Sequence, residues 1–258
     1  MTMLLWAGCT ACRPSGQEAS ISRIDEITQR GTLLVGATGD YRPLSYFDPQ
    51  TREYWGLDVD LAEIIAHDLG VRVEFVPTSW PTLTDDMLDP TLFDVAMCGI
   101  SITDARQQVM LMSDGYLRNG KTILCRADEA YRYTSLADID QPDVVVMINP
   151  GGTNEKFAHD SLTHAQIVVH QRNEEIPSLI AEGKADIMIT EVVEASYYVR
   201  VDNRLAAPLV HEPFTHSQMG VLMRQGDDEL LERVNAIIDS CRTDGTLLLL
   251  HQKYGLAY

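Results

Sequence analysis

Three segments of the sequence carry side chains that suit chemistry on a small charged molecule. Arg106 follows Thr103-Asp104 at the start of a predicted helix, and its planar guanidinium suits two-point recognition of a carboxylate. The loop 151–155 (GGTNE) lies between a predicted strand and a predicted helix, where backbone N–H groups and the positive helix end can receive an anion. Glu194 lies at a strand–helix junction, where a carboxyl group enclosed in an apolar cleft would stay protonated and could donate its proton.

Each segment also has a plain structural interpretation. Arg106 would be a solvated helix charge, Thr153 or Asn154 would cap a helix, and Glu194 would be a surface glutamate of an acidic protein. Residue type and spacing alone favour these interpretations. The loop 151–155 is not a Walker phosphate loop either, because no Gly-Lys-Ser/Thr closes it.

Other reactive side chains lack the spacing that metal binding or nucleophilic catalysis requires. The five cysteines include one Cys-x-x-Cys pair, Cys9 and Cys12, with no second pair. Cys98 and Cys125 lie in apolar segments and are predicted to be buried thiols. We predict no metal site, because the histidines are scattered without ligand spacing, at His164, His170, His211 and His216.

Composition indicates a globular chain and excludes two classes of partner. The 258 residues are 45% hydrophobic and 22% charged. Twenty Lys and Arg against 38 Asp and Glu give a formal net charge of -18, which repels phosphate backbones and anionic lipid. No apolar run approaches the roughly 20 residues that span a bilayer. We therefore expect neither nucleic-acid binding nor a membrane span.

The first twenty residues are predicted to be the remnant of an export signal and a linker. The segment 4–9 (LLWAGC) is similar to the end of such a signal with an imperfect lipobox, and a polar linker over 13–20 follows it. No basic residue precedes Arg13, so the signal pattern is partial. We expect a periplasmic or exported protein, with Cys9 as a possible site of a lipid anchor.

From Ile21 onward, short apolar runs alternate with amphipathic patterns, which indicates an α/β fold with mostly parallel sheets. A first series has predicted strands at 32–37, 72–76 and 93–97, and predicted helices at 59–69, 81–88 and from 104 onward. A second series has predicted strands at 144–148, 167–169 and 186–189, and predicted helices from 154, at 174–182 and at 192–199.

The last part of the chain has a predicted strand at 220–223 and helices at 228–241 and 247–254, but no sheet of its own. Its strand must therefore join a sheet already built. This arrangement predicts two lobes with two hinge crossings and an interlobe cleft that binds a ligand. The predicted division is a linker at 1–20, a first lobe at 21–120 plus 216–258, and a second lobe at 121–215.

Four segments resemble the periplasmic solute-binding proteins that bind polar amino acids. They are 39–46 (GDYRPLSY), 56–62 (GLDVDLA), 101–106 (SITDAR) and 244–246 (DGT). Within that superfamily, 77–81 (PTSWP), 119–122 (NGKT), 149–158 (NPGGTNEKFA) and the Glu194-Ala195 pair after Thr190 resemble the cyclohexadienyl dehydratases. The resemblance implies a two-lobed type II periplasmic-binding-protein fold. It also implies conversion of prephenate to phenylpyruvate, of L-arogenate to L-phenylalanine, or of both, without a cofactor.

The resemblance implies catalytic roles for Glu194, Lys121 and Asn154. Glu194 would be the general acid that assists loss of the ring hydroxyl. Lys121 would supply positive charge beyond Arg106, which binds the substrate carboxylate, and Asn154 would hydrogen-bond the substrate. From the residues alone, Lys121 would instead be a plain loop charge.

The resemblance implies further substrate contacts from Thr153, Trp80, Asp40, Tyr41 and Ser101, with the flat side chains as walls of the cleft and Asp40 near the ring hydroxyl or the acid. Packing and turn roles are the alternatives for Trp80 and Asp40.

Glu191 departs from the dehydratase pattern, which has the shorter Asp here. In amino-acid binders an acid near this position pairs with the ligand's ammonium group. The choice between prephenate and arogenate therefore stays open.

A second function class shares the fold and the arginine. An amino-acid-binding subunit of an ABC importer would use Arg106 in the same way but would carry out no reaction, and the fold does not decide between the two. The joint presence of Asn154, Lys121 and Glu194 favours the enzyme. The sequence leaves the oligomeric state open.

Overall fold

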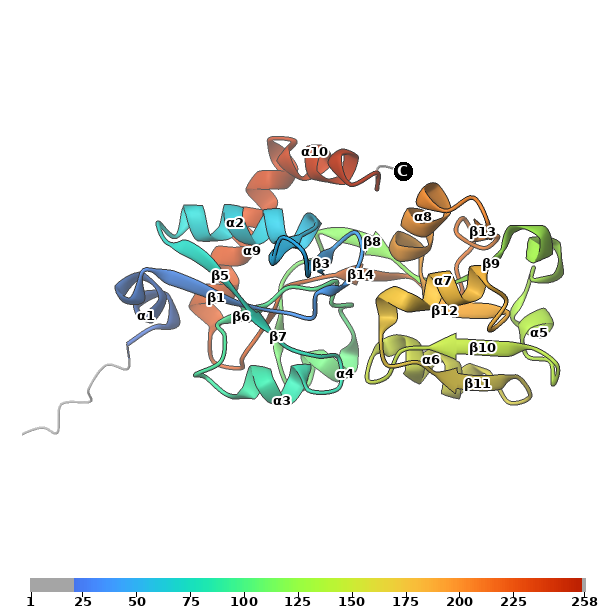
Figure 1. Ribbon diagram of the computed structural model, residues 1–258. Coiled ribbons are helices and arrows are strands. Elements are labelled where there is room, and N and C mark those ends of the chain that lie inside the picture. Colours follow the sequence, from blue (N-terminus) through green and yellow to red (C-terminus); the bar gives the residue numbers. More distant parts are fainter. Residues whose placement is uncertain (1–20, 257–258) are drawn as a thin grey trace, which may run out of the picture.

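Two five-stranded sheets, one in each half of the molecule, organise residues 21–256, the part of the chain that the computed structural model describes (Figure 1). Helices cover both sheets, and the two halves lie side by side as two lobes (Figure 1). The predicted α/β, two-lobed fold is confirmed. The predicted signal remnant and Cys9 lie outside the described residues.

The sheet of the first lobe is parallel at one edge and antiparallel at the other. Its strands lie in the order β5 (Arg72–Pro77), β1 (Thr32–Ala37), β6 (Val95–Ala96), β15 (Leu222–Met223) and β7 (Leu111–Met112). β1 pairs in parallel with β5 and β6, whereas β15 is antiparallel to β6 and β7. The late apolar strand thus joins the sheet built first, as predicted.

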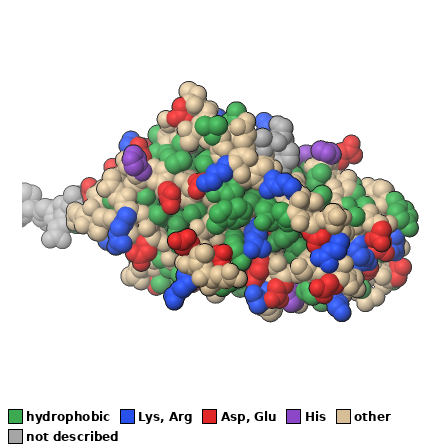
Figure 2. All heavy atoms as spheres, turned by 45° about the horizontal axis from the view of Figure 1, so that its top comes forward, with side chains coloured by type: hydrophobic (Ala, Val, Ile, Leu, Met, Phe, Trp, Pro, Cys, Tyr) green, Lys and Arg blue, Asp and Glu red, His purple; other side chains and the backbone are tan. Residues whose placement is uncertain are grey.

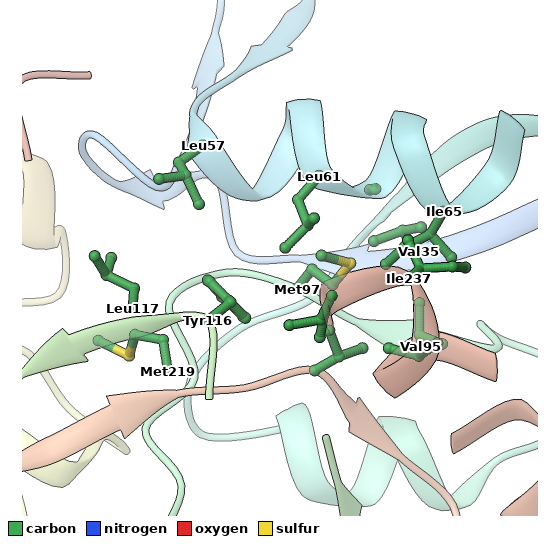
Figure 3. Close-up of a cluster of buried hydrophobic side chains, with 14 of the residues drawn as sticks. Val35, Leu57, Leu61, Ile65, Val95, Met97, Tyr116, Leu117, Met219 and Ile237 are labelled. Carbon is green, nitrogen blue, oxygen red and sulfur yellow. The ribbon is translucent and has the colours of Figure 1, made fainter. Parts of the chain in front are cut away.

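Helices pack apolar side chains onto this sheet. On α2 (Leu57–Asp68), Leu61 and Ile65 are fully buried and lie over Val35 of β1 and Val95 of β6 (Figure 3). Residues at i and i+4 share one helix face, so both side chains face the sheet. The other helices of the lobe are α1 (Arg23–Arg30), α3 (Leu83–Leu88), α4 (Asp104–Gln107), α9 (Asp228–Thr243) and α10 (Thr246–Lys253).

The sheet of the second lobe repeats the plan with other strands. Its order is β11 (Gln166–Val169), β10 (Val145–Ile148), β12 (Ile187–Glu191), β9 (Lys121–Arg126) and β13 (Leu205–Ala206). β10 is parallel to β11 and β12, and β9 is antiparallel to β12 and β13. The helices of the lobe are η1 (Ala127–Arg132), α5 (Leu136–Ile139), α6 (Thr153–Ser161), η2 (Asn173–Glu175), α7 (Ile176–Ala181) and α8 (Val192–Val201).

Two antiparallel strands carry the chain between the lobes. β8 (Leu117–Asn119) leads out of the first lobe, and β14 (Ser217–Met219) leads back. They pair from Leu117 with Met219 to Asn119 with Ser217. The division of the chain at 120/121 and 215/216 stays a prediction.

Several elements differ from the sequence expectation. The segment 93–97 forms only a two-residue strand, β6. Phe93, the first residue of that segment, lies before β6 and is buried with its ring against Gly36. A Cβ added to Gly36 would lie 2.7 Å from this ring. The short meander of β2 (Asp40–Tyr41), β3 (Ser45–Asp48) and β4 (Glu53–Trp55) was not predicted, because its strands are too short for a periodic pattern.

A group of side chains connects the two lobes away from the crossings, and we call Trp55, Tyr197, Arg200 and Tyr254 the rim cluster. The ring of Trp55 lies 5.2 Å from that of Tyr254 within the first lobe and 6.2 Å from that of Tyr197 on α8. The Arg200 guanidinium of α8 donates to the Tyr254 carbonyl oxygen at 3.1 Å. The Trp55–Tyr197 and Arg200–Tyr254 contacts cross from one lobe to the other.

Within residues 21–256, no helix is long and apolar enough to cross a membrane. Cys98 and Cys125 are buried free thiols, as predicted, and burial raises the pKa of each to about 12.

Candidate active site

The predicted site residues come together where the two lobes meet. In the first lobe, Asp40, Trp80 and Ser101 follow the carboxyl ends of parallel strands β1, β5 and β6. In the second lobe, Thr153 begins helix α6 after the loop that follows β10, and β12 ends at Glu191. Ligands of open α/β sheets bind outside the carboxyl ends of the strands, so the topology brings these distant segments to one place.

A small cavity of about 20 Å³ lies among these residues. A cavity needs about 10–15 Å³ to hold one water molecule, so this cavity has room for one or two. A substrate with a six-membered ring is far larger, and the lobes must separate before such a molecule can bind. The lining residues are Tyr41, Trp80, Gly99, Ser101, Arg106, Asn149, Gly152, Thr153, Asn154, Asn173 and Glu191.

The Glu191 carboxylate joins both lobes at the centre of the site. Its Oε1 accepts from Ser101 Oγ at 2.8 Å and from Lys121 Nζ at 2.8 Å. Its Oε2 accepts from the Tyr41 hydroxyl at 2.6 Å and from Asn119 Nδ2 at 3.1 Å. Burial works to raise the pKa of Glu191, but Lys121 and these hydrogen bonds outweigh it and lower the pKa below 4.5. Glu191 is therefore a carboxylate, and each of its two oxygens accepts two hydrogen bonds.

Lys121 is buried beside the start of helix α6. Its Nζ donates to Thr153 Oγ1 at 2.6 Å, to Asn154 Oδ1 at 2.6 Å and to Glu191. Three acceptors match the three N–H bonds of an ammonium group. Burial lowers the pKa of Lys121, and Glu191 opposes that effect.

The prediction that Thr153 or Asn154 caps a helix is wrong. Gly152 occupies the N-cap position without a side-chain cap, and the Gly151 N–H donates instead to Glu155 Oε2 at 2.7 Å. Both predicted capping side chains are thereby free to contact Lys121.

Arg106 lies in the first turn of α4 and lines the cavity. Thr103 caps this helix by accepting from the Arg106 N–H at 3.2 Å, which fixes where the arginine emerges. The Arg106 Nη1 atom donates to the Ser101 carbonyl oxygen at 2.7 Å. The guanidinium has further donors in a planar fork, which can bind a carboxylate.

Glu194 lies in the first turn of α8 and is completely buried. Its Oε2 contacts Thr190 Oγ1 at 2.5 Å, and its Oε1 accepts from Asn173 Nδ2 at 2.7 Å. Burial raises the pKa of Glu194 to about 8, so the carboxyl group is mostly protonated at neutral pH. Glu194 does not line the cavity itself, and Asn173 lies between the two.

Tyr41, Trp80 and Asp40 form one side of the site. The rings of Tyr41 and Trp80 meet edge to face with centroids 5.9 Å apart. Trp80 Nε1 donates to Asp40 Oδ1 at 3.0 Å, and burial raises the pKa of Asp40. Trp80 and Tyr41 both line the cavity. Tyr46 lies outside the cavity lining, with the Arg42 guanidinium 3.5 Å from its ring centroid.

Three asparagines of the site were not predicted from the sequence. Asn149 and Asn173 line the cavity, and Asn119 contacts Glu191 from β8. Asn149 directly follows β10, and Asn173 lies shortly after β11, so both follow carboxyl ends of parallel strands. The rule that predicts ligand sites at those ends would have found them.

No group of three or more His, Cys, Asp or Glu side chains that could bind a metal ion occurs among residues 21–256.

Residues 33–257 match the family of bacterial extracellular solute-binding proteins, family 3. A relative from Pseudomonas aeruginosa, a cyclohexadienyl dehydratase, is 44% identical over 218 residues, which cover 84% of this chain and 79% of the relative. The crystal structure of an ancestral amino acid-binding protein, a precursor of cyclohexadienyl dehydratase, aligns with a TM-score of 0.84 at 38% identity. That alignment covers 90% of this chain and 99% of the other.

The structure of an ancestral cyclohexadienyl dehydratase is 50% identical, with a TM-score of 0.56, and the alignment covers 90% of this chain and 96% of the other. The chain therefore belongs to family 3 of the bacterial extracellular solute-binding proteins, a family of exported proteins that bind small solutes.

Proposed function

We propose that this protein is a cyclohexadienyl dehydratase, which converts prephenate to phenylpyruvate, L-arogenate to L-phenylalanine, or both. In either reaction the bond between the ring and its carboxylate breaks, and CO2 leaves. The electron pair of that bond enters the ring as the carbon–oxygen bond on the opposite side breaks. The departing oxygen takes a proton and leaves as water, and the ring becomes aromatic. Because aromatisation drives the reaction, the protein's main task is to protonate the leaving hydroxyl.

The burial of the Glu194 carboxyl group is the main support for this proposal. A completely buried carboxyl group with a pKa near 8 keeps its proton at neutral pH and can donate it. Binding an amino acid without a reaction requires no proton donor. After donation Glu194 is a carboxylate, and solvent returns the proton when the lobes open.

The other site residues bind the two anionic ends of the substrate. Arg106 binds one carboxylate through its planar fork. Lys121 is already surrounded by Thr153, Asn154 and Glu191, and a substrate carboxylate would replace some of these contacts. Trp80 and Tyr41 pack against the ring and exclude water.

The test is turnover of fresh prephenate near neutral pH, measured as phenylpyruvate above the spontaneous background and repeated with arogenate. We expect rapid turnover by the wild type. Glu194→Gln should lower kcat by about 100- to 10,000-fold, the range that general acid catalysis contributes. Calorimetric binding of phenylpyruvate should change little, because the amide has nearly the same shape as the carboxyl group.

Glu63→Gln is the matched control, since Glu63 is an exposed glutamate on α2 outside the site. It should retain wild-type turnover. Full activity of Glu194→Gln would show that another group protonates the hydroxyl. Absence of wild-type turnover, together with tight binding of an ordinary amino acid, would instead identify a receptor subunit of an ABC importer.

We also propose that the chain divides into lobes at 21–120 plus 216–258 and at 121–215. A separate proposal is that Cys9 carries a lipid anchor in the native host. The lipobox-like segment 4–9 supports the anchor. Mass spectrometry of the protein purified from its host would show the added lipid mass, and an unmodified Cys9 would rule the anchor out.

A further inference from the structure

Asn173 separates the buried acid from the cavity. It is the first residue of η2, is 1% exposed and lines the cavity. Its Nδ2 donates to Glu194 Oε1 at 2.7 Å and to the Asp40 carbonyl oxygen at 3.1 Å. Both N–H bonds of the amide are therefore used, and they fix the orientation of the side chain.

The Oδ1 atom of the same amide is buried and has no hydrogen-bond partner among the described residues. Buried acceptors without a donor are uncommon, because losing the hydrogen bond to water is unfavourable. Since Asn173 lines the cavity, a donor on a bound molecule can supply the missing hydrogen bond. A hydroxyl group next to the acid is such a donor.

We propose that Asn173 is a further catalytic residue, which accepts a hydrogen bond from the ring hydroxyl of the substrate at Oδ1 while its Nδ2 orients the Glu194 carboxyl group. This inference rests on the proposed function. The hydroxyl hydrogen points at Asn173, so the oxygen lone pairs are left free for the proton of Glu194. When the carbon–oxygen bond breaks, the oxygen takes that proton, and the product water is still hydrogen-bonded to Oδ1.

Asn173 also acts on the ionisation of Glu194. Its N–H donates to the carboxyl group and favours the ionised form, so it partly opposes the rise in pKa that burial causes. Loss of Asn173 should therefore raise the pKa of Glu194 further. The titratable groups that face Glu194 from neighbouring elements stay in place in such a variant: Asp40, Tyr41, Lys121, Glu191 and Tyr198.

The experiment compares Asn173→Leu with Asn149→Leu in the full chain. Asn149 is the matched control, because it lines the same cavity and also has an unpartnered Oδ1 but does not contact Glu194. For Asn173→Leu we expect kcat for prephenate to fall by about 100-fold, the scale of losing one hydrogen bond to reacting atoms, with little change in KM. The alkaline limb of its kcat–pH profile should move to higher pH. Asn149→Leu should leave that limb where it is in the wild type.

Asn173→Ser provides a second variant if the leucine does not fold. Its short hydroxyl cannot replace the amide contact with Glu194, so the limb should move as well. Carbon-13 NMR of labelled glutamate carboxyls measures the Glu194 titration without turnover and should show the same rise. An unchanged kcat and an unchanged Glu194 titration in an active enzyme would overturn the role of Asn173 alone. A wild type that consumes neither prephenate nor arogenate would overturn the proposed function and the catalytic role together.

Discussion

The burial of Glu194 both suits proton donation and lowers the stability of the folded protein. It forms hydrogen bonds with Thr190 and Asn173 but no ion pair with any described residue. The folded protein therefore favours the neutral acid, and the pKa rises from 4.5 to about 8. A neutral carboxyl group suits proton donation, but the same burial makes the folded state less stable once the group must ionise.

The sign of this effect gives a prediction for thermal stability. Below pH 4.5 both the folded and the unfolded state hold the proton. Between pH 4.5 and about 8 only the folded state holds it, so stability falls as the pH rises through this range and levels off above it. Glu194→Gln removes this contribution, and its Tm should exceed that of the wild type at pH 8 by at least about 2–4 °C.

At pH 5 the difference in Tm should be much smaller, because pH 5 lies near the lower end of this range and the amide resembles the protonated acid, and this pH is the control. Buried Asp58, whose pKa burial raises to about 7, leaves a smaller slope in both proteins. Parallel Tm profiles from pH 5 to 8 in scanning calorimetry would contradict the raised pKa of Glu194.

At the scale of elements, the loop after β10 must approach the first lobe closely. Gly151 has a φ of +82°, and a Cβ placed there would lie 2.4 Å from the backbone nitrogen of Pro81. Pro81 lies just before α3 in the other lobe. Glycine is therefore needed at this position both for the left-handed backbone and for lobe closure.

Gly151→Ala should hinder closure without unfolding either lobe. We expect kcat/KM for prephenate to fall by about 100-fold, the effect of displacing catalytic groups by about 1 Å. Gly183→Ala is the matched control, because Gly183 has a φ of +73° but has no atom nearer than 3.9 Å to the added Cβ. It should lose about 1–2 kcal/mol of stability from backbone strain and keep its kcat/KM. Equal activity losses in both variants would show that strain, and not closure, matters.

In the molecule as a whole, direct side-chain contacts hold the two lobes together. Bonds from Ser101 and Tyr41 to Glu191 and the rim cluster both connect them. Figure 2 shows hydrophobic side chains gathered in the middle of one face, with acidic and basic side chains interspersed around them. On that face the excess of acidic residues forms no single patch.

Trp55→Ala should shift the molecule towards an open form. An aromatic pair contributes about 0.5–1.5 kcal/mol, so loss of the Trp55–Tyr197 contact should lower the ratio of closed to open molecules by about two- to tenfold. Small-angle X-ray scattering of the unliganded protein should then show a larger radius of gyration. Tyr131→Ala is the control, because Tyr131 is 80% exposed on the second lobe. If both variants scatter like the wild type, the rim cluster does not stabilise closure.

The alternation of strands and helices could be predicted from the amino-acid sequence, because apolar periodicity reflects which face of each element is buried. The pattern on α2 and the late strand β15 are examples. The sequence also indicated Arg106, Lys121 and Glu194, because their local motifs resemble those of a known family.

The interactions among these residues could not be predicted from the sequence. The Lys121–Glu191 pair, the protonation of Glu194 and the position of Asn173 all depend on burial and on contacts between segments 21 to 150 residues apart. Local sequence does not encode the dielectric around a carboxyl group, since that environment is built by both lobes together.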